Sequence, residues 1–359
     1  MHLKSLKARQ FKNFSEKDFD FSSKINAIVG QNGKGKTNIL DAVHYLALSK
    51  SYLNHSDAMN IQFDHDFFVL DGLFENENGE DQVFCLVRKG QAKQLKKNGK
   101  PYDRLADHIG QFPVVMISPY DNDLINEGSE VRRKFLDNII SQANKSYLQN
   151  LIRYNKVLAQ RNALLKYFAA NQTFDSSSLE IYDLELVQLG NAIHNERKAF
   201  IQNFSEAFLT YYAAISEEKE QVNIRYVSQL NDRPFELLLQ EHLHKDRQAQ
   251  HTTVGIHKDD LDFQIFYHPV KKFGSQGQQK SYLIALKLAQ LEVIKNALNT
   301  TPILLLDDIF DKLDEHRVTQ LIRLVNEDRF GQIFITDTHP ERTESIVKRI
   351  NAESKIFRL

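Results

Sequence analysis

One segment of the chain, Gly30-Gln31-Asn32-Gly33-Lys34-Gly35-Lys36-Thr37, has the GxxxxGK[ST] spacing of a phosphate-binding loop. Backbone N–H groups of such a loop surround phosphate oxygens, and the start of a helix adds partial positive charge. We expect Lys36 to reach the β and γ phosphates and the Thr37 hydroxyl to ligate Mg²⁺. The alternative is an ordinary glycine-rich turn. The buried strand before the loop and the helix from Asn38 favour a triphosphate site over residues 30–38.

Two carboxylates follow a second apolar run, Ile303-Leu304-Leu305-Leu306. A P-loop needs a strand that ends in a carboxylate beside Mg²⁺, and Asp307 is placed to hold the metal through its water shell. Asp308 lies one position further and is placed to orient or polarise an attacking water. Many buried parallel strands end in acids, so this signal is weak alone. Together with the loop it makes Lys36 and Asp308 the catalytic candidates.

A third segment, residues 273–280, precedes a helical run from Ser281 to Ala297. Its small and hydroxyl-bearing residues at a helix start form a second potential anion site. A single triphosphate bound by Lys36 does not need both sites, so the pattern indicates a nucleotide shared between two copies of the chain. The candidate residues of this second site are Ser275, Gly277 and Gln278.

The period of the hydrophobic residues predicts the elements that position these sites. Residues 2–29 alternate as strands, residues 38–48 form a helix, and residues 67–102 form an antiparallel sheet with turns at Asn78-Gly79 and Asn98-Gly99. Between about 130 and 220 the period becomes helical, which predicts two antiparallel helices separated by the polar stretch 171–178. The helical stripe consists of Leu186, Leu189, Ile193, Phe200, Phe204, Phe208 and Tyr211.

The pattern returns to α/β after residue 220. We therefore predict an α/β head with mixed β-sheets that is discontinuous in sequence, with an inserted, mainly helical lobe. Residues 1–125 form its N-terminal part, residues 126–222 the inserted helical hairpin lobe, and residues 223–359 its C-terminal part. The aromatic residues of the lobe are interpreted as core.

Composition excludes several classes of protein. The 359 residues are 42% hydrophobic and 26% charged, which is typical of a folded globular chain and not of a disordered one. The net charge is −1, so any contact with DNA or a membrane must come from a local patch. No apolar run approaches the length of a spanning helix, and the single cysteine, Cys85, cannot form an internal disulfide. We expect a cytoplasmic protein that does not insert in a membrane.

The most basic segment runs from Arg88 to Arg104 around the Asn98-Gly99 turn. Its lysines are candidates for contacting DNA phosphates; the alternative is a solvated sheet edge that resists aggregation. A second candidate is the pair Arg132 and Arg133, whose alternative role is a helix-start surface. Contacts to the DNA backbone would give little sequence specificity. The candidate lysines are Lys93, Lys96, Lys97 and Lys100.

Taken in order, the P-loop, the SxGQ segment, the Asp307 strand and Asp311-Lys312-Leu313-Asp314 resemble an ATP-binding-cassette (ABC) ATPase of the DNA-repair branch. The resemblance is strongest to the RecF family and spans nearly the whole chain. The family's other matching segments are residues 11–14, Ser118-Pro119-Tyr120-Asp121, Gly128 with residues 132–137, and residues 255–261.

The resemblance implies an ABC head that binds ATP and Mg²⁺ and hydrolyses ATP slowly. Ser275 and Gly277 would contact the γ-phosphate held by the opposite subunit of an ATP-dependent homodimer, and Lys12 and Asn13 would lie near the nucleoside. It also implies binding to duplex, gapped or junction DNA in recombinational repair and replication restart. There the protein would help mediators, notably of the RecR type, to load recombinase on single-stranded DNA.

Some positions depart from related patterns. Asp308 stands where transporter ATPases have glutamate, and Tyr120 stands where an acid is common. The position of the transporters' switch histidine falls on Thr338, and His339, one residue beyond, is expected to be a solvated loop residue. His257 has either a structural or a functional role. The rival functions are a transporter ATPase, a P-loop kinase for small molecules, and a mainly structural tether.

Overall fold

The computed structural model describes residues 1–54, 56–216, 220–309, 319, 330–350 and 352–359, and all structural statements refer to these residues. The chain forms two compact units. The head unit contains Met1–Asn122, Thr210–Glu218 and Gln276–Leu359, and the helical unit contains Asp123–Leu209 and Lys219–Ser275. The segment Asp311-Lys312-Leu313-Asp314 lies outside the described residues.

The first sheet of the head unit is antiparallel, as the alternating pattern predicted. Inward side chains of β4 and β5, such as Phe68, Leu70 and Cys85, are buried, and their neighbours along the strand are partly exposed. The turn at Asn98-Gly99 forms as predicted, with positive φ at both residues. The other turn falls one residue earlier than predicted, on residues 77–78, because Gly79 already pairs with Asn76. The strand order is β2 (Phe14–Asp20), β1 (His2–Phe11), β4 (Phe67–Asn76), β5 (Gly79–Arg88), β6 (Gln94–Lys97), β7 (Lys100–Pro101).

The second sheet of the head unit is parallel throughout. Its three central strands and β8 are buried along their whole length, as expected for a parallel sheet covered on both faces. Parallel strands bring their carboxyl ends to one edge, so the loops after β3 and β12 start at the same edge. The strand order is β14 (Ser354–Arg358), β3 (Ile25–Val29), β13 (Ile333–Asp337), β12 (Ile303–Leu306), β8 (Val114–Ile117).

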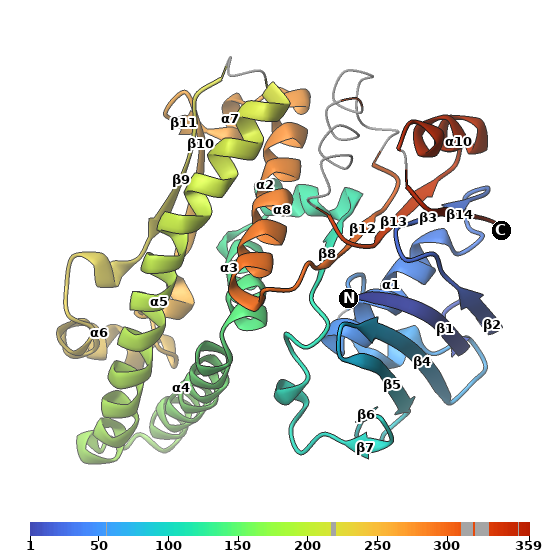
Figure 1. Ribbon diagram of the computed structural model, residues 1–359. Coiled ribbons are helices and arrows are strands. Elements are labelled where there is room, and N and C mark those ends of the chain that lie inside the picture. Colours follow the sequence, from blue (N-terminus) through green and yellow to red (C-terminus); the bar gives the residue numbers. More distant parts are fainter. Residues whose placement is uncertain (55, 217–219, 310–318, 320–329, 351) are drawn as a thin grey trace. The chain divides into compact units, whose positions relative to one another are not determined.

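Helix α1 (Lys36–Leu48) packs against strands of both sheets, β4 and β5 of the first and β8 and β13 of the second (Figure 1). Eleven of its residues are buried, on all sides of the helix. Gly72 of β4 permits this contact, because a Cβ there would lie 2.6 Å from the Cδ1 atom of Leu46. The other described helices that lie wholly in the head unit are α8 (Gln276–Leu298) and α10 (Pro340–Arg349), and the end of α5 (Ser176–Ser216), from Thr210, also belongs to it. Short 3-10 turns lie at Asp57–Asn60, Leu105–Asp107 and Pro119–Asn122.

The helical unit contains the predicted antiparallel helices. Arg161 of α4 (Lys145–Asn171) pairs with Asp183 of α5 (Ser176–Ser216) at 2.5 Å. The predicted stripe is buried along α5, except for Phe200, which is half-buried. A three-stranded sheet has the order β11 (His268–Pro269), β10 (Asp260–Ile265), β9 (Val222–Val227). The other elements are α2 (Asp123–Asn126), α3 (Ser129–Ala143), α6 (Phe235–Ala249), α7 (Val270–Phe273) and 3-10 turns at Gln229–Asn231 and Ile256–Lys258.

The compact units divide the chain differently from the three segments expected from sequence. Residues 223–275, which we expected in the head, group with the helices. The reason is that β9 pairs with β10 in a separate sheet and extends neither sheet of the head unit. Arg132 of α3 also pairs with Asp260 of β10 at 2.7 Å. Among the described residues, no helix is long and apolar enough to cross a membrane.

Candidate nucleotide-binding site

The P-loop connects β3 to α1 in the head unit, as the sequence predicted. Gly33 and Gly35 have φ values of 81° and 97°, in the left-handed region that glycine adopts without strain. Gly35 also allows a close approach, because a Cβ there would lie 2.6 Å from the Nδ2 atom of Asn13. At Gly30, a Cβ would lie 2.8 Å from the carbonyl oxygen of Leu359. The loop shape therefore depends on glycine at these positions.

The Lys36 side chain is directed back along its own loop. Its Nζ donates hydrogen bonds to the carbonyl oxygens of Gly30 at 2.9 Å and Gln31 at 3.3 Å, and lies 3.5 Å from the Oδ1 atom of Asn32. Lys36 is buried, with 4% of its surface exposed. Lys34 is exposed. The Lys36 ammonium group is thus held within the loop by neutral oxygens, which a phosphate group can replace with a stronger, charge-assisted contact.

Asp307 lies at the end of β12 and meets the P-loop. Thr37 and Thr336 each donate a hydrogen bond from Oγ1 to the Asp307 Oδ1 atom at 2.8 Å, and the Ser118 Oγ lies 3.5 Å from Oδ2. Burial raises the pKa of Asp307 above its ordinary value, and the hydrogen bond from Thr37 opposes this shift. Hydroxyl and carboxylate oxygens are the protein ligands that Mg²⁺ takes beside phosphates and water. The donor set of Thr37 and Asp307 therefore fits the predicted metal.

Asp308 follows with a left-handed backbone, at φ 45°. Its amide donates to the Thr336 Oγ1 atom at 2.9 Å, and this contact fixes the chain where it leaves the strand. Asp308 lines a hollow of about 50 Å³ together with Ser118, Lys280 and Asp307. A hollow of this volume holds a water molecule. The second carboxylate is therefore placed beside a water-sized space.

Lys12 and Asn13, implied as nucleoside neighbours, lie against α1. The Asn38 Nδ2 atom donates to Asn13 Oδ1 at 2.7 Å. The Lys12 ammonium lies 2.5 Å from the Oδ2 atom of Asp41, a buried carboxylate on α1. The N-terminal strand pair is thus fastened beside the P-loop.

A buried network links these residues to α8. Lys287 of α8 pairs with Asp121 at 2.6 Å and donates to the Tyr52 hydroxyl at 3.0 Å, and Tyr52 also donates to Asp121. Asp121 accepts from the Ser118 amide at 2.7 Å, and the Tyr52 amide donates to Asp41 at 2.6 Å. Sequence reasoning noted Asp121 within a motif but did not find its partners. The available signal was one charged residue inside an apolar run of each helix, Asp41 in α1 and Lys287 in α8.

The SxGQ residues occupy the start of α8. Ser275 is exposed directly before the helix, and Gly277 and Gln278 lie in its first turn and are half-buried. An exposed hydroxyl at the start of a 23-residue helix is a geometry that suits an anion presented by another molecule.

The candidate DNA lysines fall into two groups. Lys93 is held by Asp57 at 2.9 Å and by the carbonyl oxygen of Ser49 at 2.5 Å, and Lys97 pairs with Asp81 at 3.0 Å. Lys96 lies on the opposite face of β6, with its Nζ 6.0 Å from the centre of the Phe84 ring. Lys100 of β7 pairs with Lys97, so it shares the Lys97 face, and it is exposed. The lysines are therefore split between two faces of the hairpin because side chains alternate along a strand.

Arg132 and Arg133 make internal contacts in the helical unit. The Arg132 guanidinium pairs with Asp260 and donates to the carbonyl oxygens of Leu124 and Glu127. Arg133 donates to the carbonyl oxygen of Asp259 at 2.6 Å, and burial lowers its pKa. These guanidinium groups position the segment 259–260.

The sequence does not decide the roles of two histidines, His257 and His339. His257 bridges Tyr154 and the Thr252 carbonyl oxygen at 2.9 and 3.1 Å, and burial lowers its pKa to about 4. These contacts suit a structural histidine. His339 is 65% exposed in its side chain and lies beside Thr338 and Asp337.

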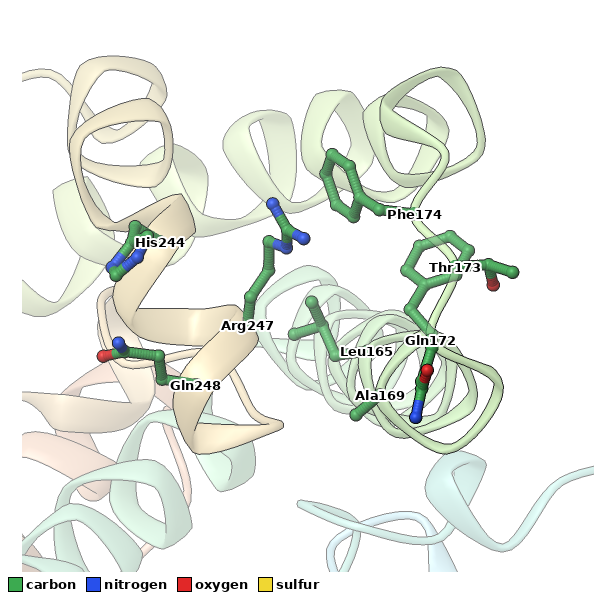
Figure 2. Close-up of a pocket in the computed structure, with 9 residues that line it drawn as sticks. Leu165, Ala169, Gln172, Thr173, Phe174, His244, Arg247 and Gln248 are labelled. Atoms are coloured by element: carbon green, nitrogen blue, oxygen red, sulfur yellow. The ribbon is translucent and has the colours of Figure 1, made fainter.

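A larger hollow, of about 420 Å³, lies in the helical unit between the end of α4 and α6 (Figure 2). The Arg247 guanidinium lies 4.0 Å from the centre of the Phe174 ring, and Leu165 and Phe168 also line the hollow. None of the residues that we predicted for a site lines this hollow.

The comparisons with known proteins agree with these features. The family described as RecF/RecN/SMC N terminal domain matches residues 2–356. The chain is 54% identical to the DNA replication and repair protein RecF of Flavobacterium johnsoniae over 359 residues, covering all of both chains. It is 39% identical to the RecF of Cytophaga hutchinsonii, over 99% of this chain and 94% of that one.

Solved structures also match the chain. The structure of the recombination mediator protein RecF-ATPrS in the RecFOR pathway matches with a TM-score of 0.88 and 28% identity, over 100% of this chain and 96% of that one. The Smc head domain from Pyrococcus furiosus matches with a TM-score of 0.57 and 16% identity, over 99% and 93%, and shows a shared fold. The predicted ABC-type head is thereby confirmed, and the chain belongs to the RecF family of DNA replication and repair proteins.

Proposed function

We propose that this protein is an ATP-dependent DNA-binding protein of recombinational repair and replication restart, with slow ATP hydrolysis. The observation that carries the proposal is the hydrogen bond between Thr37 and Asp307, which joins the P-loop to the end of β12. Support for ATP as the nucleotide comes from relatives described as RecF-ATP and RecF-ATPrS, at 29% and 28% identity. Family membership favours this function over a transporter ATPase or a small-molecule kinase.

In the proposed site each group has one task. Lys36 exchanges its loop carbonyls for the β and γ phosphates, and the P-loop amides of residues 30–38 surround them. Thr37 and Asp307 hold Mg²⁺, which neutralises phosphate charge when bound. Asp308 orients a water molecule and accepts its proton in the hollow shared with Ser118 and Lys280. Lys12 and Asn13 lie on the nucleoside side.

ATP is proposed to join two copies of the chain. The exposed Ser275 of one copy, with Gly277 and Gln278, contacts the γ-phosphate bound at Lys36 of the other. A ligand that touches both copies stabilises the dimer, and hydrolysis removes the bridging phosphate. ATP therefore drives assembly and hydrolysis releases the pair.

DNA is proposed to contact the β6–β7 hairpin through its phosphates. Lys96 and Lys100 carry this proposal, because Lys93, Lys97, Arg132 and Arg133 are already engaged by carboxylate or carbonyl oxygens. The bound DNA is duplex, gapped or junction DNA, and the dimer helps a RecR-type mediator to load recombinase in the cytoplasm.

The test uses two variants, Lys36→Ala and Ser275→Arg, in sedimentation with ATP, ADP or no nucleotide, with and without gapped duplex. Each variant alone should stay monomeric with ATP while keeping its circular dichroism spectrum. A mixture of the two should regain dimers, because a mixed pair contains one intact Lys36 loop facing one intact Ser275. Failure of the mixture to dimerise, or dimers in either variant alone, would refute the shared site.

A further inference from the structure

The turn between β10 and β11 has unusual residues for its backbone. Ile265 pairs with His268, so Phe266 and Tyr267 form a two-residue turn, and their φ values of 48° and 65° are both positive. Turns of this type favour Asn-Gly, because a side chain in the left-handed region is strained. The same chain uses Asn98-Gly99, at φ 50° and 76°, in another turn of this kind. Strain that a simple replacement would relieve is a reason to look for a function.

The turn holds aromatic rings in solvent. Phe266 is 48% exposed and Tyr267 is 74% exposed. Phe273, which is 61% exposed, stacks with His268 at 4.6 Å between ring centres. We call these four residues the aromatic turn. Gln221 fixes it by accepting from the Phe266 amide and donating to the Tyr267 hydroxyl, both at 2.8 Å.

The segment that follows the turn carries positive charge, whereas Glu220 precedes Gln221, the residue that holds the turn. No acidic residue occurs between Asp262 and Glu292 in the sequence, whereas Lys271 and Lys272 lie in this stretch and are exposed on α7. The Lys271 ammonium donates to the carbonyl oxygen of Asn126 at 2.5 Å. Asp262 itself pairs with Arg225 of β9 at 3.1 Å. The segment that follows the turn in sequence therefore combines exposed rings with exposed lysines.

We propose that the aromatic turn stacks on unpaired bases of a DNA strand whose phosphates contact Lys272. Exposed aromatic rings beside cations are the means by which proteins bind single strands without sequence preference, because every base has a flat face. Phenylalanine and tyrosine are also enriched in protein interfaces, but lysine is depleted there, so rings next to lysine favour a DNA strand over a protein. The inference rests on the proposed function only in taking DNA as the ligand, and it is independent of the ATP site.

The first test uses Tyr267→Trp. The chain contains no tryptophan, so this variant reports from the turn alone. Oligo(dT) should quench its fluorescence, whereas an abasic strand of equal length, with the same phosphates and no bases, should not. Equal quenching by both strands, or quenching by neither, would overturn the proposal and leave a protein surface as the alternative occupant. If the protein binds no DNA of any kind, the proposed function fails as well; if duplex binds but oligo(dT) does not quench, only this inference fails.

The second test is the double variant Phe266→Asn/Tyr267→Gly, which installs the residues that the turn prefers. Its melting temperature should rise because the backbone strain is removed, while its affinity for oligo(dT) should fall about tenfold or more. The control is Phe63→Ser, which removes an 88% exposed ring from the head unit and should leave affinity unchanged. Unchanged oligo(dT) affinity in the double variant, or an equal loss in the control, would overturn the proposal.

Discussion

The Thr37 hydroxyl donates to the Asp307 carboxylate at 2.8 Å across 270 positions of the chain. This contact joins the two chemical motifs that the sequence placed far apart, and it fixes the carboxylate at the mouth of the P-loop. Thr336 donates to the same oxygen, so two hydroxyl groups hold one buried carboxylate.

Asp307→Asn should separate folding from chemistry. The amide oxygen still accepts from Thr37 and Thr336, and the loss of a buried charge with a raised pKa removes a desolvation cost, so the melting temperature should not fall. ATP hydrolysis should fall tenfold or more, about 1.4 kcal/mol in the barrier. Phosphate release and thermal melting measure the two effects. A variant that hydrolyses ATP at the normal rate would exclude Asp307 from the metal site.

Two glycines of the P-loop form a matched pair. Gly35→Ala places a Cβ 2.6 Å from Asn13, whereas Gly33→Ala meets no atom within 4 Å, and both positions have positive φ. Gly33→Ala should cost only the backbone strain, about 1–2 kcal/mol. Gly35→Ala should lower the melting temperature further and weaken ATP binding more, as calorimetry would measure. Equal effects would show that the approach of Asn13 does not matter.

Lys287→Met should destabilise the head unit by about 3–5 kcal/mol, because Asp121 becomes an unpaired buried charge. The double variant Lys287→Met/Asp121→Asn should recover part of this loss, since the amide oxygen still accepts from the Ser118 amide. Urea unfolding followed by circular dichroism measures both. If the double variant were no more stable than the single one, the pair would not be the cause.

His257 should make stability depend on pH. Its pKa in the folded protein is lowered to about 4 from 6.5, so the unfolded chain binds the proton first as the pH falls. The stabilisation is complete above about pH 6.5 and is lost toward pH 4, a total of about 3 kcal/mol. His257→Gln keeps a donor for Thr252 and an acceptor for Tyr154 and should reduce the fall in melting temperature between pH 7.5 and 5; His44 and His108, whose pKa values burial also lowers to about 4, account for the rest. An unaltered slope would contradict this assignment.

The double variant Lys96→Ala/Lys100→Ala should weaken duplex binding for all sequences alike. If each lysine meets one phosphate, the slope of log K against log salt should decrease by about 1.8. Lys93→Ala is the control, because its ammonium is held by Asp57 and Ser49 and should change stability without changing that slope. Fluorescence anisotropy over a range of salt distinguishes the two. A steeper loss for Lys93→Ala would reassign the DNA surface.

The parts of the site that are local in sequence could be predicted. Residues 30–38 carry their chemistry within nine consecutive positions, and the strand before Asp307 is recognisable from its apolar run. The helices of the second unit follow from their period. These features need no knowledge of distant partners.

The remaining parts depend on contacts between distant segments. Lys287 and Asp121 are 166 positions apart by residue number, and nothing near either residue indicates the other. Lys93 and Lys97 looked free in sequence because Asp57 and Asp81 lie on other elements. The membership of residues 223–275 in the helical unit depends on which strand β9 pairs with, which alternation alone does not specify.

The position of α1 between two sheets has a consequence for hydrogen exchange. The backbone amides of α1 are hydrogen-bonded within the helix, and strands of both sheets contact the helix. These amides should therefore exchange only when the head unit opens as a whole. Local opening that admits a nucleotide must then occur in residues 30–35, ahead of the helix. Deuterium uptake in this stretch should respond to ATP analogues while the amides of α1 remain slow.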